Sequence, residues 1–416
     1  MNLESLKTVC VVGWGKSGSA LVGLLLALGK KAKVSEQKER KDFAPGPIDS
    51  FIKQGVEFEF GSHSKKFIKD CQLAVVSPGV DTFKSQAFKV IQGLEIPIVG
   101  EIEFSFWLTK ANCVAITGTN GKTTTAHLTY QVLRSKRKRV FLGGNIGTPF
   151  ASFVLETKKN DTVVLEISSF QLETIIKFRP QVAALLNIAP DHLDRYQNFS
   201  GYLQAKMNIF RNQIKDDYAV LNKAEDINFE KFVSIRSQIL YFSDEFPNEN
   251  FSCVYRIARI YGLSKTDCQV VFSKFRGLPH RQQLVREING ITFINDSKAT
   301  NPSSTIWALK NTRGPVILLA GGKDKGLDYS VILPYLKRVK KINLFGQAAR
   351  LIADCLKNGV PLEVFLSLKE AVEASFFKAQ EGDTVILSPM CASFDMFSNY
   401  QERGDKFIEM VNNLKS

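Results

Sequence analysis

The sequence predicts an α/β protein with three domains: a Rossmann-like N-terminal domain, a central P-loop ATPase-type domain built on a parallel sheet, and a Rossmann-like C-terminal domain. Two observations support this prediction. Short apolar runs alternate with helical stretches along most of the 416 residues, which is the order typical of parallel sheets covered by helices. A chain of this length also exceeds what one ordinary hydrophobic core accommodates. We expect the domains to cover residues 1–100, 101–300 and 301–416.

The first segment opens with the strand-like run TVCVVGWG, followed by the helix-like KSGSALVGLLLALGKK and the strand AKVSE. Its glycines match GxGxxG, and Glu36 follows at about the distance of a ribose-binding acid. Alone, this pattern indicates NAD binding, but it is weak, because it marks a tight turn that holds any phosphate or none. A later strand, LAVV, ends in a turn of Ser77, Pro78 and Gly79. The economical interpretation is a small Rossmann-like domain with its glycine pattern at Gly13, Gly15 and Gly18.

The central segment carries a glycine-bearing loop, GTNGKT, between the strand KANCVAI and the helix TTTAHLTYQVLRSKRK. A strand, such a loop and a helix N-terminus together present backbone N–H groups to an anion. Lys122 would reach the terminal phosphates, and the Thr123 hydroxyl would ligate Mg²⁺. The loop is shorter than a Walker A loop, because Ile116 stands where the first glycine is needed. A solvated turn that caps the helix is the alternative, and the strand–loop–helix order favours the phosphate site.

Several polar side chains follow the strands of this central segment. Glu166 ends the run TVVLE, Asn145 lies in a glycine-rich turn, and Asp191 and His192 follow VAALLNI. Open α/β sheets bind ligands at the carboxyl ends of their strands. Glu166 and Thr123 would therefore give Mg²⁺ two oxygen ligands beside a triphosphate. His192 alone would be a buried histidine, but its place beside Asp191 in a P-loop sheet favours a second metal role.

The third segment repeats the alternation of strands and helices. Its strands are PVILLAGG, KINLFG, EVFL and DTVILSP, and the helix-like runs between them are YSVILPYLKRV, AARLIADCLKN and LKEAVEASFFKAQ. This order predicts a second doubly wound domain. Two of its strands end in the loops GGKDKGLDY and SPMCASFDMF, which we expect to contact a ligand.

Composition and charge limit the classes of protein to which this chain can belong. Hydrophobic residues make up 44% and charged residues 23%, which describes a soluble globular chain. The longest apolar run, near residues 20–29, is too short to span a bilayer, and no secretory signal is visible. The seven cysteines show no CxxC pair and predict reduced thiols in a cytoplasmic protein.

The net charge of +14 is spread along the chain rather than gathered into patches with interleaved aromatic residues. Polyanionic small substrates, or simply a basic surface, explain it as well as nucleic acid does. We expect no nucleic-acid partner, no membrane span and a monomer.

The motifs GTNGKTTT, GGNIGTP, LEISSFQLE, NIAPDHLDRY, AKMNIF, GLPHR, INDSKATNP, AGGKDKGLDY and LSPMCASFDMFSNYQERG occur in this order along the chain. Together they resemble the Mur ligase family over essentially the whole length. The runs SSFQLE, DHLDRY and SPMCASFDMF are most similar to the branch that adds D-glutamate. The resemblance implies ATP-dependent addition of D-glutamate to UDP-N-acetylmuramoyl-L-alanine through an acyl phosphate, in peptidoglycan synthesis.

The resemblance also implies roles for single residues. ATP would lie along Gly118, Thr119, Asn120, Gly121, Lys122, Thr123 and Thr124, with Asn145 and Asn301 beside it. One Mg²⁺ would be held by Thr123 and Glu166, and a second by His192 and Lys206. Lys206 would be carbamylated by CO₂, which explains a lysine on an otherwise apolar helix face, where a half-buried lysine normally extends to solvent. The residues implied in catalysis are Lys122, His192 and Lys206.

The substrates would occupy the outer domains. The UDP-linked acceptor would contact Lys16, Ser17, Glu36, Gln37, Lys38, Ser77 and Gly79 in the first domain, and Ser168 and Gln171 in the second. D-Glutamate would lie near Lys325, Ser393, Phe394 and Tyr400. Some positions depart from the family pattern: Tyr400 stands where Phe is usual, Met390 stands where Ala is usual, and Lys323 adds positive charge to its loop.

Three other functions explain less of the chain. A folylpolyglutamate synthase would leave the N-terminal glycine pattern without a purpose. Assignment as an NAD(P)-linked oxidoreductase would depend on that glycine pattern alone and would leave the phosphate loop unexplained. A nucleotide-gated binding module would bind ATP but release no phosphate in response to an acceptor.

Overall fold

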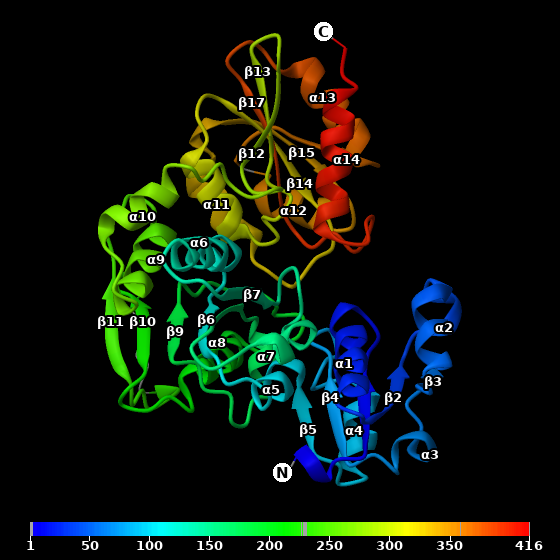
Figure 1. Ribbon diagram of the computed structural model, residues 1–416. Helices are drawn as coiled ribbons and strands as arrows, with labels where there is room; N and C mark the ends of the chain where they lie inside the picture. Colours follow the sequence, from blue (N-terminus) through cyan, green and yellow to red (C-terminus); the bar gives the residue numbers. More distant parts are fainter. Residues whose placement is uncertain (1–2, 226, 228–230, 358, 416) are drawn as a thin grey trace. The chain divides into compact units, whose positions relative to one another are not determined.

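The structure is a computed structural model that describes residues 3–225, 227, 231–357 and 359–415. Three sheets flanked by helices follow one another along the chain (Figure 1). The chain divides into two compact units. Unit 1 comprises Met1–Ile188 and Ser200–Lys274, and unit 2 comprises Ala189–Phe199 and Phe275–Ser416. In the described part of the chain, no helix has the length and apolar character needed to cross a membrane.

The first sheet is fully parallel, in the order β3-β2-β1-β4-β5. The strand order reverses at β1, which pairs with both β2 and β4, so this sheet is doubly wound as predicted. The strands are β1 (Thr8–Val12), β2 (Lys31–Glu36), β3 (Glu57–Phe60), β4 (Leu73–Val76) and β5 (Ile98–Gly100). The helices are η1 (Leu3–Ser5), α1 (Lys16–Ala27), η2 (Arg40–Asp42), α2 (Pro45–Lys53), α3 (Lys65–Ile68) and α4 (Gln86–Gln92).

The second sheet is also fully parallel, in the order β11-β10-β9-β6-β8-β7. Its strands are β6 (Asn112–Thr117), β7 (Val140–Gly144), β8 (Thr162–Glu166), β9 (Val182–Leu185), β10 (Tyr218–Asn222) and β11 (Gln238–Phe242). Its α-helices are α5 (Glu101–Phe106), α6 (Lys122–Arg134), α7 (Ser169–Leu172), α8 (Phe199–Met207), α9 (Glu249–Ile260) and α10 (Lys265–Phe272). The 3₁₀ helices described beside this sheet are η3 (Phe150–Ser152), η4 (Val154–Glu156) and η5 (Asn208–Phe210).

The third sheet lies in unit 2 and is mixed, in the order β12-β13-β17-β14-β15-β16. Its edge strand β12 runs antiparallel to β13, whereas the sequence predicted only strands that alternate with helices. The turn Asn289–Gly290 joins the two strands, and both of its residues have positive φ, 52° and 74°. An Asn-Gly pair favours a tight hairpin turn. The strands are β12 (Gln283–Ile288), β13 (Ile291–Asn295), β14 (Val316–Gly321), β15 (Val339–Phe345), β16 (Leu362–Phe365) and β17 (Thr384–Met390).

The helices of the third sheet are α11 (Pro302–Asn311), η7 (Tyr329–Arg338), α12 (Ala349–Leu356), α13 (Leu368–Lys378) and α14 (Tyr400–Asn412). The run YSVILPYLKR forms a 3₁₀ helix rather than an α-helix. Pro334 lies inside this run. A proline supplies no backbone N–H and disturbs an α-helix at that point.

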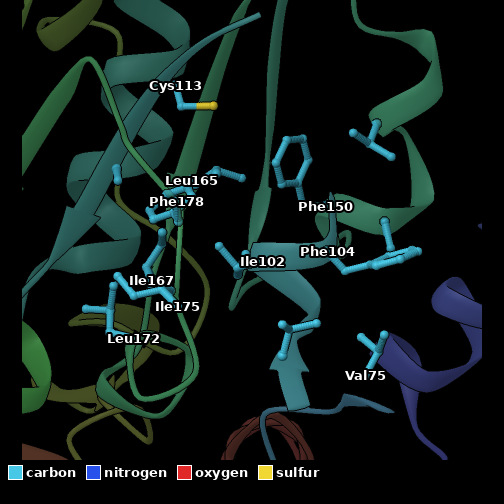
Figure 2. Packing of buried hydrophobic residues seen from close by; sticks show 14 of the residues in the cluster. Val75, Ile102, Phe104, Cys113, Phe150, Leu165, Ile167, Leu172, Ile175 and Phe178 are labelled. Carbon is cyan, nitrogen blue, oxygen red and sulfur yellow. The ribbon is translucent and has the colours of Figure 1, made fainter. Parts of the chain in front are cut away.

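Among the described residues of unit 1, one hydrophobic cluster is shared by its two sheets, and a second cluster belongs to the first sheet and its helices. The shared cluster joins Val9 and Val75 of the first sheet to Cys113 and Leu165 of the second. Helix α5 contributes to the same cluster, and Figure 2 shows its residues Ile102 and Phe104 with Phe150 and Phe178. The two sheets therefore form one compact unit although each has its own topology.

Helix α5 carries two buried carboxylates with contrasting surroundings. Glu103 is fully buried and accepts hydrogen bonds from Trp107 Nε1 and from the backbone N–H groups of Ile176, Lys177 and Phe178, at 2.5–2.9 Å. Glu101 is also buried, but only its Oε1 has a partner, the backbone N–H of Ala151 at 2.7 Å, and its Oε2 has none. Burial raises the pKa of Glu101 from 4.5 to about 7, although the hydrogen bond from Ala151 opposes the rise.

The raised pKa of Glu101 predicts a pH-dependent stability that Glu101→Gln removes. The folded state keeps this proton to a higher pH than the unfolded chain does, so the stability from Glu101 is present below pH 4.5 and lost as the pH rises through about 7. Between pH 5 and pH 8 the wild type should lose up to about 3 kcal/mol of unfolding free energy relative to Glu101→Gln. Urea denaturation at each pH measures the difference. Glu57→Gln, at an exposed carboxylate, is the control, and equal pH profiles for all three proteins would contradict this account.

Candidate active site

The loop between β6 and α6 depends on glycine at two positions. Gly118 and Gly121 have φ of 149° and 83°, conformations that residues with a side chain rarely adopt. A Cβ at Gly118 would stand 3.0 Å from the Cβ of Leu186, and a Cβ at Gly121 would stand 2.3 Å from Asn250 Oδ1. The loop therefore lies close against its neighbours, and it leads directly into the first turn of α6, which contains Lys122, Thr123 and Thr124.

Two lysines donate to one carbonyl oxygen of this loop. Lys122 Nζ lies 2.8 Å from the Gly118 oxygen and 2.7 Å from that of Thr119, and Lys206 Nζ lies 2.8 Å from the same Gly118 oxygen. Lys206 is 1% exposed and stands over the ring of Tyr202 at 4.6 Å. Two ammonium groups at a helix N-terminus concentrate positive charge, which suits a phosphate-bearing ligand.

Asn187 holds the same loop and had no role in our sequence prediction. Its Oδ1 accepts from the Asn120 backbone N–H at 2.8 Å, and its Nδ2 donates to the Asn120 carbonyl at 3.3 Å. Its own carbonyl accepts from Thr119 N–H at 2.9 Å. A side-chain amide can satisfy both backbone groups of one residue only when the loop lies alongside it, and nothing local in the sequence marks that neighbour.

Glu166 ends β8 next to Ile116 of β6, at the carboxyl edge of the second sheet. Its Oε1 accepts from Asn145 Nδ2 at 2.9 Å, while its Oε2 is buried without a hydrogen-bond partner. A buried carboxylate oxygen without a partner requires an explanation, and a hard cation such as Mg²⁺ provides one. Within the described residues, no group of three or more His, Cys, Asp and Glu could hold a metal ion. An ion at Glu166 would therefore take its other ligands from phosphate, hydroxyl or water.

The residues expected to hold the UDP-linked acceptor lie at the carboxyl ends of β1, β2 and β4. Ser77 Oγ donates to the Gly13 carbonyl at 3.0 Å. Glu36 accepts from the backbone N–H groups of Trp14 at 2.5 Å and Lys38 at 2.9 Å, so its carboxylate braces the first βα turn. Four further expected residues are partly or fully exposed beside these turns: Lys16, Ser17, Gln37 and Gly79.

The structure brings two expected acceptor residues from different sheets into one cleft of unit 1. Ser77 and Gln171 both line this narrow cleft. Gln171 Oε1 accepts from the Ser168 backbone N–H at 3.0 Å, and Ser168 Oγ caps α7. Gln171 Nε2 is buried without a hydrogen-bond partner. A donor in this position suits a carbonyl or hydroxyl of a ligand.

Unit 2 contains Asp191 and His192, in the segment Ala189–Phe199 that interrupts unit 1 along the chain. Asp191 accepts from Lys325 Nζ at 2.8 Å and from Asn301 Nδ2 at 2.9 Å. His192 Nε2 lies 3.8 Å from Asp191 Oδ2. Burial alone would raise the pKa of Asp191, but the charges of Lys325 and His192 and these hydrogen bonds outweigh it, so the pKa lies well below its usual range. Three expected site residues thus surround one carboxylate that had no assigned role.

The two loops expected near D-glutamate are joined by backbone hydrogen bonds. Lys323 and Ala392 exchange N–H···O bonds of 2.8 and 3.1 Å. Ser393 is buried, whereas Phe394 is 68% exposed. Tyr400 begins α14, and Lys298 Nζ lies 3.8 Å from the centroid of its ring.

Arg403 stabilises these loops and was not predicted. Its buried guanidinium donates to Ser297 Oγ and to the carbonyls of Ser297, Cys391 and Ala392, at 2.8–3.2 Å. Burial lowers its pKa to about 10. The run YQERG gave no signal for this role, because only the fold places the guanidinium beside those carbonyls.

The candidate site residues are divided between the two units. Unit 1 contains the phosphate loop with Thr123, Glu166 and Lys206, and unit 2 contains His192, Asn301, Lys325, Ser393 and Tyr400.

The chain matches three family models, all of them Mur ligase domains. Residues 7–100 match the Mur ligase MurD-like N-terminal domain, residues 116–273 the Mur ligase middle domain, and residues 280–391 the Mur ligase glutamate ligase domain. Together these models account for most of the chain, in the expected order.

Curated relatives match almost the whole chain. The UDP-N-acetylmuramoylalanine--D-glutamate ligase of Caldicellulosiruptor bescii is 40% identical, and the match covers 98% of each chain. The enzyme of the same name from Thermoanaerobacter pseudethanolicus is 37% identical, covering 98% of this chain and 99% of its own.

Solved structures share the fold at lower identity. The UDP-N-acetylmuramate-alanine ligase MurC of Thermotoga maritima is 18% identical with a TM-score of 0.63, covering 99% of this chain and 100% of its own. The MurF ligase of the same organism, solved in complex with ADP, is 17% identical with a TM-score of 0.59, covering 99% and 96%. Since relatives well above 30% identity extend over nearly its full length, the chain belongs to the Mur ligase family, within the group of UDP-N-acetylmuramoylalanine--D-glutamate ligases.

Proposed function

We infer that the chain is an ATP-dependent ligase that joins D-glutamate to UDP-N-acetylmuramoyl-L-alanine, with release of ADP and phosphate, in peptidoglycan synthesis. The observation that carries this proposal is the convergence of Lys122 and Lys206 on the Gly118 carbonyl, in a glycine loop at the start of α6. The names of the full-length relatives supply the substrates. We propose three functional domains that act in the cytoplasm as a monomer. Their expected bounds are residues 1–100, 101–300 and 301–416, but β12 and β13 belong to the third sheet, so the third domain includes residues from at least Gln283 onward.

The reaction activates a carboxylate and then forms an amide. The L-alanyl carboxylate of the acceptor attacks the γ-phosphorus of ATP, an acyl phosphate forms and ADP leaves. The amine of D-glutamate, having lost a proton, attacks the acyl carbon, and phosphate leaves as the amide forms. Lys122 and the loop Gly118–Thr124 would hold the phosphates and balance their charge through the N–H groups other than those of Thr119 and Asn120, which donate to Asn187, while Asn145 and Asn301 would lie beside the nucleotide.

Mg²⁺, when bound, would offset the charge that spreads over the transferring phosphoryl group. Thr123 and Glu166 suit one ion, because the Glu166 Oε2 atom is buried without another partner. His192 and Lys206 are the residues we propose for a second ion. Carbamylation of Lys206 would keep one N–H to donate to the Gly118 carbonyl and would replace the ammonium with an anionic ligand.

Substrate recognition would be divided between the domains. The acceptor would contact Lys16, Ser17, Gln37, Lys38, Ser77, Gly79, Ser168 and Gln171, with Glu36 bracing the turn. D-Glutamate would lie near Lys325, Ser393, Phe394 and Tyr400. Water would hydrolyse the acyl phosphate, so we expect closure of the third domain to accompany chemistry.

Substrate specificity is tested by ATP-dependent phosphate release with UDP-N-acetylmuramoyl-L-alanine. We expect release with D-glutamate but not with L-glutamate, L-lysine, meso-diaminopimelate or L-alanine, because one pocket must fit both carboxylates of the D-enantiomer. Mass spectrometry should show a product heavier by one glutamyl residue. Release with another amino acid would assign the chain to a sister step, and nucleotide binding without release would favour a binding module.

Lys122→Ala should reduce turnover by about 10²–10³-fold, because a charged donor to the transferring phosphate is lost. The matched control is Lys136→Ala, at an exposed lysine near the other end of α6 that pairs with Asp267. Steady-state phosphate release measures both variants. Near-normal ligation by Lys122→Ala would refute the proposed role of the loop.

Carbamylation of Lys206 predicts that activity depends on CO₂. Wild-type turnover should fall in CO₂-depleted buffer and recover when bicarbonate is added. Lys206→Ala should have low turnover that bicarbonate does not change, while Lys177→Ala, at an exposed lysine, should respond like the wild type. A wild type that is insensitive to CO₂ depletion, together with an unmodified Lys206 in its mass spectrum, would exclude the carbamate.

A further inference from the structure

Asp191 contacts three residues, and the proposed function assigns each of them to a different ligand: D-glutamate, the nucleotide or a metal ion. Its Oδ1 accepts from Lys325, near D-glutamate, and its Oδ2 accepts from Asn301, near the nucleotide. His192, a proposed metal ligand, donates its backbone N–H to Asp191 Oδ1 at 2.8 Å. All four residues belong to unit 2. One carboxylate therefore fixes groups from three separate segments of the chain.

The contacts of Asp191 are buried and specific. The side chains of Asp191 and Lys325 are only 7% and 9% exposed. Loss of one partner from a buried pair leaves an uncompensated charge. Asn301 uses its Oδ1 to cap α11 through the Ser304 N–H at 2.9 Å, so its Nδ2 is directed to Asp191. Lys325 and Asn301 therefore each need a hydrogen-bond acceptor, and the two carboxylate oxygens of Asp191 supply one each.

The position of Asp191 along the chain extends this effect to the phosphate loop. Asn187, which holds Asn120, stands four residues before it. Four residues span at most about 14 Å when fully extended. A short stretch of backbone therefore ties Asp191 to the residue that holds the phosphate loop.

We propose that Asp191 is a positioning residue that holds Lys325, Asn301 and the His192 segment in the arrangement needed for D-glutamate transfer. This proposal rests on the proposed ligase function. Asp191 need not touch a substrate. Its carboxylate orients the Lys325 ammonium and fixes the start of α11, so that the D-glutamate side and the nucleotide side of unit 2 are set together.

Asp191→Asn tests the proposal because it keeps the size but exchanges one acceptor for a donor. In either orientation, an N–H group of the new amide faces Lys325 or Asn301. We expect the KM for D-glutamate to rise at least tenfold and kcat to fall, with the KM for the UDP-linked acceptor changed less than twofold, because its proposed contacts lie in unit 1. Amide hydrogen exchange should become faster over residues 189–199.

Asp383→Asn is the matched control. Asp383 is also buried in unit 2 and pairs with Lys340 at 2.8 Å, but it stands before the first residue of β17, at the opposite end of that strand from the loop 391–397. We expect this variant to lose thermal stability comparably while keeping wild-type KM values and wild-type exchange over residues 189–199. Asp191→Glu, which keeps both acceptors, should restore part of the D-glutamate affinity.

Other outcomes would overturn the proposal. Unchanged D-glutamate kinetics in Asp191→Asn would make the contacts merely structural, and so would equal losses in both variants. A lower KM for D-glutamate would show that Asp191 competes with the substrate for Lys325. If the wild type itself ligates no D-glutamate, the proposed function fails. In that case amide hydrogen exchange over residues 189–199 still tests whether Asp191 holds this segment. Equal exchange rates in the wild type and Asp191→Asn would refute the positioning role.

Discussion

The convergence of two lysine ammonium groups on the Gly118 carbonyl is the constraint on which the rest of unit 1 depends. A carbonyl oxygen can accept from both Lys122 and Lys206 only if the loop lies open toward each of them. Glycine at position 118 permits the required φ, and Asn187 fixes the next two residues. Helix α8 must then bury Lys206 against Tyr202 rather than let it reach solvent. The second sheet and its helices are thus arranged around one short segment of backbone.

The division into two units follows from where hydrophobic side chains cluster. One hydrophobic cluster of unit 1 joins residues from both of its sheets, while the two main clusters of unit 2 lie on either side of the third sheet and draw on residues from 285 onward. Each unit therefore buries apolar side chains of its own. Only the segment Ala189–Phe199 is exchanged along the chain, and it carries His192 and Asp191.

Much of the fold was predictable because it depends on local pattern. Apolar runs and glycine turns located β1, β4, β6, β8 and β14 and the loop at Gly118, and the fold class was confirmed. The β12–β13 hairpin was not predicted, although Asn289–Gly290 is a strong local signal for one. The roles of Asn187, Asp191 and Arg403 could not be predicted in the same way, because their partners are 67 to 134 residues away or belong to loops without a regular period. Glu36 matched a ligand-binding pattern, yet its carboxylate accepts from two backbone N–H groups, which the spacing alone does not reveal.

The buried charges of this chain separate into two kinds by their partners. Glu103 accepts four N–H donors, and Arg403 donates to four oxygen atoms, so protein groups compensate each of them and both stabilise the fold. Glu166 differs, because one carboxylate oxygen has a partner and the other has none. Leaving a buried carboxylate oxygen without a hydrogen-bond partner costs free energy, and a chain retains such a group where a ligand supplies the missing contact.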